Sequence, residues 1–162
     1  MNRIIELRKK NEGFTDDNFE NLVITIGSIA KIEGLDKLVN LQRISIFNNS
    51  IREIEGLDKL CRLKFLCLDG NKIKKIKGLE NLTSLEKLIL SRNQIEKIEG
   101  LNSLVNLKHL DLSRNKIKKI EGLDSLVNLK YLWIYGSMIK KIEGLSKLAN
   151  IEELWLMYSD IE

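Results

Sequence analysis

Three residues of the types that hydrolytic enzymes use lie two positions apart, at His109, Asp111 and Ser113. In an extended strand, residues two apart point to the same side, so these side chains would share one face. A serine nucleophile, a histidine base and an aspartate that orients the base is the chemistry such a set could support. The spacing opposes it, because alternate Cα atoms of a strand lie about 6.6 Å apart and the face would be open to solvent. We therefore expect no enzyme activity.

Metal and cofactor chemistry is equally weakly supported. The chain has one histidine and two cysteines, and no glycine-rich phosphate loop or set of residues with metal-ligand spacing accompanies them. We expect no cofactor and no metal. Cys61 and Cys67 are expected on different sides of the chain, so a disulfide between them is not predicted.

Composition predicts a soluble chain of one-domain size, with 162 residues, 43% of them hydrophobic and 31% charged. The net charge of +4 comes from 27 basic and 23 acidic residues, which is too balanced to indicate a nucleic-acid partner. The first residues, MNRIIELRKKNEGF, lack the apolar core of a signal peptide, and no stretch approaches the roughly 18 apolar residues of a membrane span. We expect an intracellular protein, cytoplasmic or nuclear, with no membrane partner.

The elements that position these residues belong to a repeat of 22 residues. The stretch from Leu107 reads LKHLDLSRNKIKKIEGLDSLVN, and the one from Leu85 reads LEKLILSRNQIEKIEGLNSLVN. An Asn at the end of a strand can satisfy buried backbone groups, and a repeated Gly indicates a positive φ or close contact between coils. We assign both residue types a structural role. They are Asn49, Asn71, Asn93 and Asn115, and Gly56, Gly78, Gly100 and Gly122.

Each frame carries apolar residues that alternate along a strand and then recur through a return segment, so stacked frames would share one core. A period of roughly 20 to 29 residues headed by LxxLxLxxNxI resembles that of leucine-rich repeats. The resemblance implies an α/β fold of the leucine-rich repeat class: a right-handed solenoid or horseshoe. A parallel β-sheet would line its concave face, with short 3-10 or helical return segments on the convex face.

The repeat also predicts how the chain is divided. Residues 1–18 stand outside it and are interpreted as an N-terminal cap. Residues 19–162 form the repeat domain, with six full repeats from 19 to 150 and a partial seventh over 151–162. The seventh frame ends soon after its strand, which would expose apolar residues. The chain is then either a piece of a longer protein or associates end to end, as a homodimer through its C-terminal end.

A binding site is expected where the repeat permits variation, on the outward positions of the strands. Both tryptophans and all three tyrosines collect in the last two frames, and these are the residue types that dominate binding hot spots. The alternative is that the aromatic rings pack on one another or under a missing cap. The predicted partner-binding residues are His109, Asp111, Arg114, Tyr131, Trp133, Tyr135, Glu153, Trp155, Met157 and Tyr158.

The frame LxxLxLxxNxIxxIxGLxxLxx, with IEGL in most copies, resembles the class typified by the leucine-rich-repeat regulatory subunit of protein phosphatase 1. Glu153 followed by Trp155 is similar to the acidic and aromatic pair of its phosphatase-binding members. The stretch NIEELWLMY is similar to axonemal dynein light chain 1. The resemblance implies a non-catalytic scaffold for a phosphatase catalytic subunit, or for a cytoskeletal motor or tubulin-associated protein. The IEGL copies and the N-terminus argue against bacterial internalins.

Overall fold

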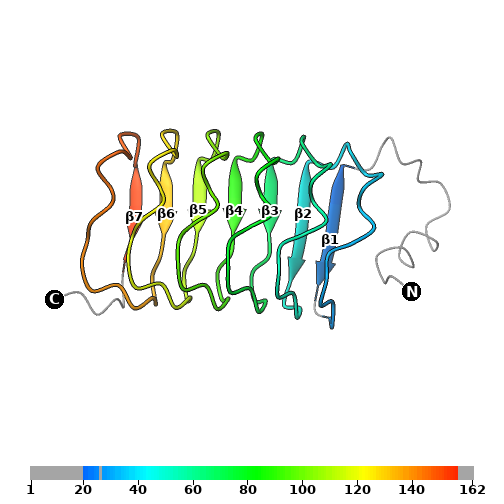
Figure 1. Ribbon diagram of the computed structural model, residues 1–162, viewed down its shortest axis with the longest axis horizontal. Coiled ribbons are helices and arrows are strands. Elements are labelled where there is room, and N and C mark those ends of the chain that lie inside the picture. Colours follow the sequence, from blue (N-terminus) through cyan, green and yellow to red (C-terminus); the bar gives the residue numbers. More distant parts are fainter. Residues whose placement is uncertain (1–19, 26, 157–162) are drawn as a thin grey trace.

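Each repeat contributes one short strand, and seven strands lie side by side in sequence order in a single parallel sheet (Figure 1). The computed structural model describes residues 20–25 and 27–156. The predicted cap at 1–18 lies outside the described residues. The strands are β1 (Asn21–Thr25), β2 (Arg43–Phe47), β3 (Phe65–Cys67), β4 (Lys87–Ile89), β5 (His109–Asp111), β6 (Tyr131–Trp133) and β7 (Glu153–Trp155).

The strands pair without any shift in register. Leu88 of β4 lies opposite Leu110 of β5, which lies opposite Leu132 of β6, one repeat length further along the chain at each step. Equivalent positions of the repeat therefore form straight columns across the sheet. The predicted solenoid with a parallel sheet is confirmed.

The fourth and sixth positions of each frame point into the solenoid, because side chains alternate between the two faces of a strand. From β2 to β6 these residues are completely buried. In the last described coil the equivalent Leu154 and Leu156 are only half-buried. The buried set is Ile44, Ile46, Leu66, Leu68, Leu88, Leu90, Leu110, Leu112, Leu132 and Ile134.

The return segments are turns, so the predicted 3-10 or helical segments are wrong. In the first return segment, the N–H of Leu38 donates to the carbonyl of Leu35, and the N–H of Leu41 donates to that of Leu38. A 3-10 helix needs such bonds at consecutive residues, whereas these bonds are three residues apart. The resulting turns point the leucines at every third position into the core. The residues that the structure describes contain no helix that could cross a membrane.

The repeated asparagines join neighbouring coils. The side-chain amide of Asn93 donates to the carbonyls of Leu68 and Leu90, each at 3.0 Å, and its Oδ1 accepts the N–H of Ile73 at 3.0 Å. Leu68 and Ile73 belong to the preceding coil. The same bonds recur at Asn71 and in the next coil, so a column of side-chain amides satisfies backbone groups buried between the coils.

The repeated glycines are required where the coils meet. Gly100 has a φ of +68°, and a Cβ built on it would lie 2.4 Å from the carbonyl oxygen of Ile76 in the preceding coil. A side chain would therefore strain the backbone and also collide with a main-chain atom that cannot move independently. Both reasons for a repeated glycine operate at this position.

Exposed ion pairs also cross from coil to coil on the return side. Lys119 and Glu143 lie 3.3 Å apart. At the equivalent positions three coils earlier, Glu53 and Lys77 lie 2.8 Å apart with both signs reversed. Because exposed pairs contribute little stability, their main effect is to favour one lateral alignment of neighbouring coils.

Candidate partner-binding face

The rings on the outward face of β5, β6 and the last strand form a continuous group, here called the aromatic cluster: His109, Tyr131, Trp133, Tyr135 and Trp155. The ring centroids of Trp133 and Trp155 lie 5.6 Å apart, and His109 meets Trp133 edge-on at 4.5 Å. Tyr135 lies 6.4 Å from Trp155, and Tyr131 lies 5.8 Å from His109. The straight columns of the sheet bring these rings together, since Trp133 pairs directly with Trp155 in the register.

The aromatic cluster is part packed and part exposed. Trp155 keeps 46% of its surface exposed, whereas Trp133 is half-buried. The indole Nε1 of Trp133 and the Nε2 of His109 are buried and have no hydrogen-bond partner among the described residues. Burial and, to a lesser extent, the charge of Lys87 lower the pKa of His109, so its imidazole is neutral at pH 7. The rings pack on one another as the alternative hypothesis expected, yet they leave an exposed tryptophan.

His109, Asp111 and Ser113 do not form a catalytic relay. Asp111 accepts the backbone N–H of Ser113 at 2.9 Å. The hydroxyl of Ser113 is fully buried, and neither it nor His109 Nε2 has a hydrogen-bond partner in the described ranges. Asp111 is 8% exposed and lies beside Trp133 in the sheet. With one carboxylate oxygen bonded and the residue buried, Asp111 offers little surface to a partner.

Glu152, which lies just before β7, and Glu153, the first residue of β7, differ in what they contact. Glu152 accepts from the hydroxyl of Tyr131 at 2.9 Å and from Lys130 at 2.6 Å. Hydrogen bonds from Lys130 and then Tyr131 lower the pKa of this carboxyl. Glu153 is half-buried beside Tyr131 in the register. The predicted contacts Met157 and Tyr158 lie outside the described residues.

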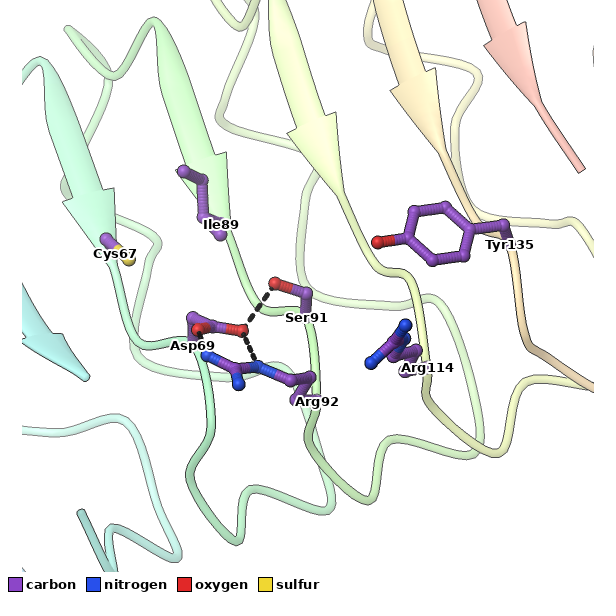
Figure 2. Close-up of a pocket in the computed structure, with 7 residues that line it drawn as sticks. All are labelled: Cys67, Asp69, Ile89, Ser91, Arg92, Arg114 and Tyr135. Carbon is purple, nitrogen blue, oxygen red and sulfur yellow. Dashed lines mark hydrogen bonds and ion pairs between the residues drawn. The ribbon is translucent and has the colours of Figure 1, made fainter. Parts of the chain in front are cut away.

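A polar hollow adjoins the aromatic cluster at the ends of strands β3 to β6 (Figure 2). Its volume is about 380 Å³. Asp69 accepts from Ser91 at 2.7 Å and from Arg92 Nε at 2.9 Å, and forms an ion pair with the Arg92 guanidinium. The hollow is lined by Cys67, Asp69, Ile89, Ser91, Arg92, Arg114 and Tyr135.

Sequence reasoning named Arg114 and Tyr135 as contact residues but missed the hollow between them. The available signal was the step from Asp69 to Arg92, which is one repeat plus one residue and therefore a diagonal contact between neighbouring coils. A diagonal pair depends on side-chain direction as well as on the register. Reading the repeat position by position therefore did not predict the contact between Asp69 and Arg92.

Neither a metal site nor a disulfide is found among residues 20–25 and 27–156. No group of three or more His, Cys, Asp and Glu residues is placed to hold a metal ion. Cys61 is exposed, Cys67 is half-buried, and both are free thiols.

Comparison with known proteins identifies the family. The family described as Leucine Rich repeats (2 copies) matches residues 61–103, 83–125 and 105–145, which together span more than half of the chain. The chain belongs to the leucine-rich repeat family. Such repeats are typically non-catalytic scaffolds on which other molecules bind.

Solved structures agree on the fold. Internalin C2 of Listeria monocytogenes is 30% identical with a TM-score of 0.79, over 84% of this chain and 60% of that one. A leucine-rich repeat protein of Leptospira interrogans is 25% identical with a TM-score of 0.81, over 88% and 38%. TLR13 in its complex with ssRNA13 is 25% identical with a TM-score of 0.80, over 86% and 21%.

The chain thus spans 60% or less of the length of each of these structures. None of the curated proteins matches it. The comparisons do not support the expected contrast with internalins, since an internalin is among the similar structures and shares the repeat frame. They also give no specific support for the phosphatase regulator or the dynein light chain.

Proposed function

We propose that this leucine-rich repeat chain is a non-catalytic adaptor that holds a protein partner against the aromatic cluster. The observation that carries the proposal is Trp155. It keeps nearly half of its surface exposed while its ring contacts those of Trp133 and Tyr135. An aromatic anchor already held by its neighbours loses little conformational freedom on binding, which favours affinity.

The partner class follows from the two sequence resemblances. Glu153 and Trp155, two positions apart on β7, are the acidic and aromatic pair that suggests a phosphatase catalytic subunit. The stretch around them supports a cytoskeletal motor or tubulin-associated protein as the alternative. Under either form the chain acts inside the cell, in the cytoplasm or nucleus, without nucleic acid or membrane.

Self-association is a second candidate, and the apolar side chains of the last two described coils favour it. Met138 and Ile142 are 50% and 51% exposed, and Leu154 and Leu156 are half-buried. These apolar side chains have a packed coil on one side only within residues 20–25 and 27–156. A second copy placed against that coil would bury them.

The deciding experiment is capture of proteins from a native lysate by the wild-type chain and by a Trp133→Ala, Trp155→Ala double variant. The partner should be lost by the variant, with the single Trp155→Ala change weakening affinity by roughly 2 kcal/mol, about 30-fold. Val127→Ala is the matched control, because Val127 is an equally exposed apolar side chain on a return segment. Equal capture by the wild type, both tryptophan variants and the Val127→Ala control would contradict the proposal.

Light scattering separates the second candidate from the first. A wild-type chain that is dimeric, and becomes monomeric in an Ile142→Lys variant, would establish association through the last coil. A monomer at all concentrations would exclude it. Phosphatase or motor subunits in the captured fraction would choose between the two partner classes.

A further inference from the structure

Two arginines occupy backbone positions that favour glycine. The residue that follows the seventh position of each frame has a positive φ in five successive coils. Asparagine and glycine tolerate that conformation, whereas another L-residue is disfavoured by about 1 to 2 kcal/mol. Backbone strain of this kind often accompanies a functional side chain, and here it occurs at Arg92 and Arg114 in adjacent coils. The five residues and their φ angles are Asn48 (54°), Gly70 (66°), Arg92 (53°), Arg114 (55°) and Gly136 (64°).

Both arginine side chains line the polar hollow, but only one is paired (Figure 2). Burial by itself would raise the pKa of Asp69, but hydrogen bonds from Arg92 and Ser91 lower it, so Asp69 is ionised and holds Arg92. The side chain of Arg114 makes no hydrogen bond or ion pair in the part of the chain that the structure describes, although its charge also lowers the pKa of Asp69. Its nearest ring is that of Tyr135, whose centroid lies 5.8 Å from the guanidinium carbon. The hollow therefore contains two arginines for one carboxylate, and one of the two cations has no directly bonded partner among the described residues.

We propose that this hollow binds the carboxylate of an acidic side chain in the partner, with Arg114 as its cation. The inference rests on the proposed function and names the chemistry of that partner. Tyr135 joins the two surfaces, because its ring approaches both Arg114 and Trp155. An acidic residue close to an apolar anchor in the partner would contact the hollow and the aromatic cluster together.

A carboxylate fits this hollow better than a phosphate group. The planar guanidinium of Arg114 can donate two parallel hydrogen bonds to a carboxylate. A phosphate monoester carries close to two negative charges at pH 7 and would lie near the ionised Asp69, with a single unpaired arginine to offset them. A singly charged carboxylate matches the charge of Arg114, the one arginine of the hollow that is not ion-paired within the described coils.

The direct test follows the Arg114 side-chain Nε–H by NMR while N-acetylglutamate methylamide is added. Binding should shift that resonance, and the uncharged N-acetylglutamine methylamide should bind about tenfold more weakly because it lacks the charge-assisted bonds. Inorganic phosphate is the third probe. An equal response to glutamine, tighter binding of phosphate than of glutamate, or an unmoved Arg114 resonance would overturn the proposal.

Arg114→Gly is the informative variant, because Gly70 and Gly136 already occupy the same position and the backbone should accept the change without strain. Backbone shifts of the hollow should then respond to N-acetylglutamate methylamide at least tenfold more weakly. Arg52→Ala, which removes one positive charge from the exposed return side, should leave the response unchanged. A variant response equal to that of wild type would exclude Arg114 as the cation.

Failure of this proposal and failure of the proposed function give different results. Trp155→Ala should lose partner capture but retain the response to N-acetylglutamate methylamide, since Trp155 does not line the hollow that binds this probe. Lost capture without any probe response in the wild type would overturn the carboxylate site alone. If the wild type responds to the probe but Trp155→Ala captures the partner as well as wild type does, the aromatic anchor alone would be overturned.

Discussion

The coils of β2 to β5 and the coil of β6 differ at the position where the repeat needs asparagine. In the central coils a side-chain amide bonds one carbonyl of its own coil, and one carbonyl and one N–H of the preceding coil, as Asn93 does. In the β6 coil the position is Ser137, which is 6% exposed and whose hydroxyl has no partner in the described residues. The central coils are therefore bound to one another by groups that the end of the stack lacks.

The outward face changes at the same place. Over β3 and β4 it holds a mixture of polar and apolar residues and the Asp69–Arg92 ion pair, and from β5 onward aromatic rings gather on it. The buried columns remain leucine and isoleucine throughout. Because stacking depends on the inward columns, the outward ones are free to differ from coil to coil, and the recognition surface is expected where they differ most.

The largest difference between the two regions should appear in their cores. Leu110→Ala in β5 should lower the free energy of unfolding by about 3 kcal/mol, since it leaves a cavity in a completely buried column. Leu154→Ala in β7 should cost less than half as much, because that side chain is half-buried. Urea unfolding followed by circular dichroism measures both. Equal losses would mean that the last coil is packed as tightly as the central ones.

The asparagine column offers a more selective test. Asn93→Ala should destabilise the chain by about 2 kcal/mol, because it leaves the buried N–H of Ile73 without a partner. The carbonyls of Leu68 and Leu90 would each lose one of two amide donors and keep the bond from Asn71 or Asn115. Ser137→Asn, the reciprocal change, should stabilise it by about 1 kcal/mol by extending the column into the β6 coil. Both follow from the same denaturation curves. Loss of stability in Ser137→Asn would show that the β6 coil has a different local geometry.

The smallest expected effect concerns His109, at the boundary between the two regions. Its pKa in the folded state is lowered by burial and by Lys87, so folding favours the neutral imidazole. The unfolded chain then binds more protons in the window below the ordinary value of about 6.5, and this contribution to stability is lost as pH falls through it. Stability of wild type relative to His109→Gln should therefore decrease between pH 7 and pH 5. A constant difference would show that the imidazole is not desolvated.

Much of this architecture could be predicted because the repeat never drifts. A constant frame, together with the two-residue period of a strand, determines which residues face inward and which strands lie side by side. The pairing of Trp133 with Trp155 follows directly from that register. The same reasoning misjudged the return segments, because leucines at every third position suit either a 3-10 helix or a pair of separate turns, and only the hydrogen bonds distinguish them.

The sequence by itself determined the columns, the core and the gathering of aromatic residues at one end of the sheet, since each depends only on position within the frame. The tertiary structure decided which side chains are available. It buried Asp111, paired Arg92 with Asp69 and left the Arg114 side chain without an ion pair or hydrogen bond in the described coils. These outcomes depend on side-chain direction, local backbone φ and diagonal neighbours, which are properties of stacked coils and not of any single frame.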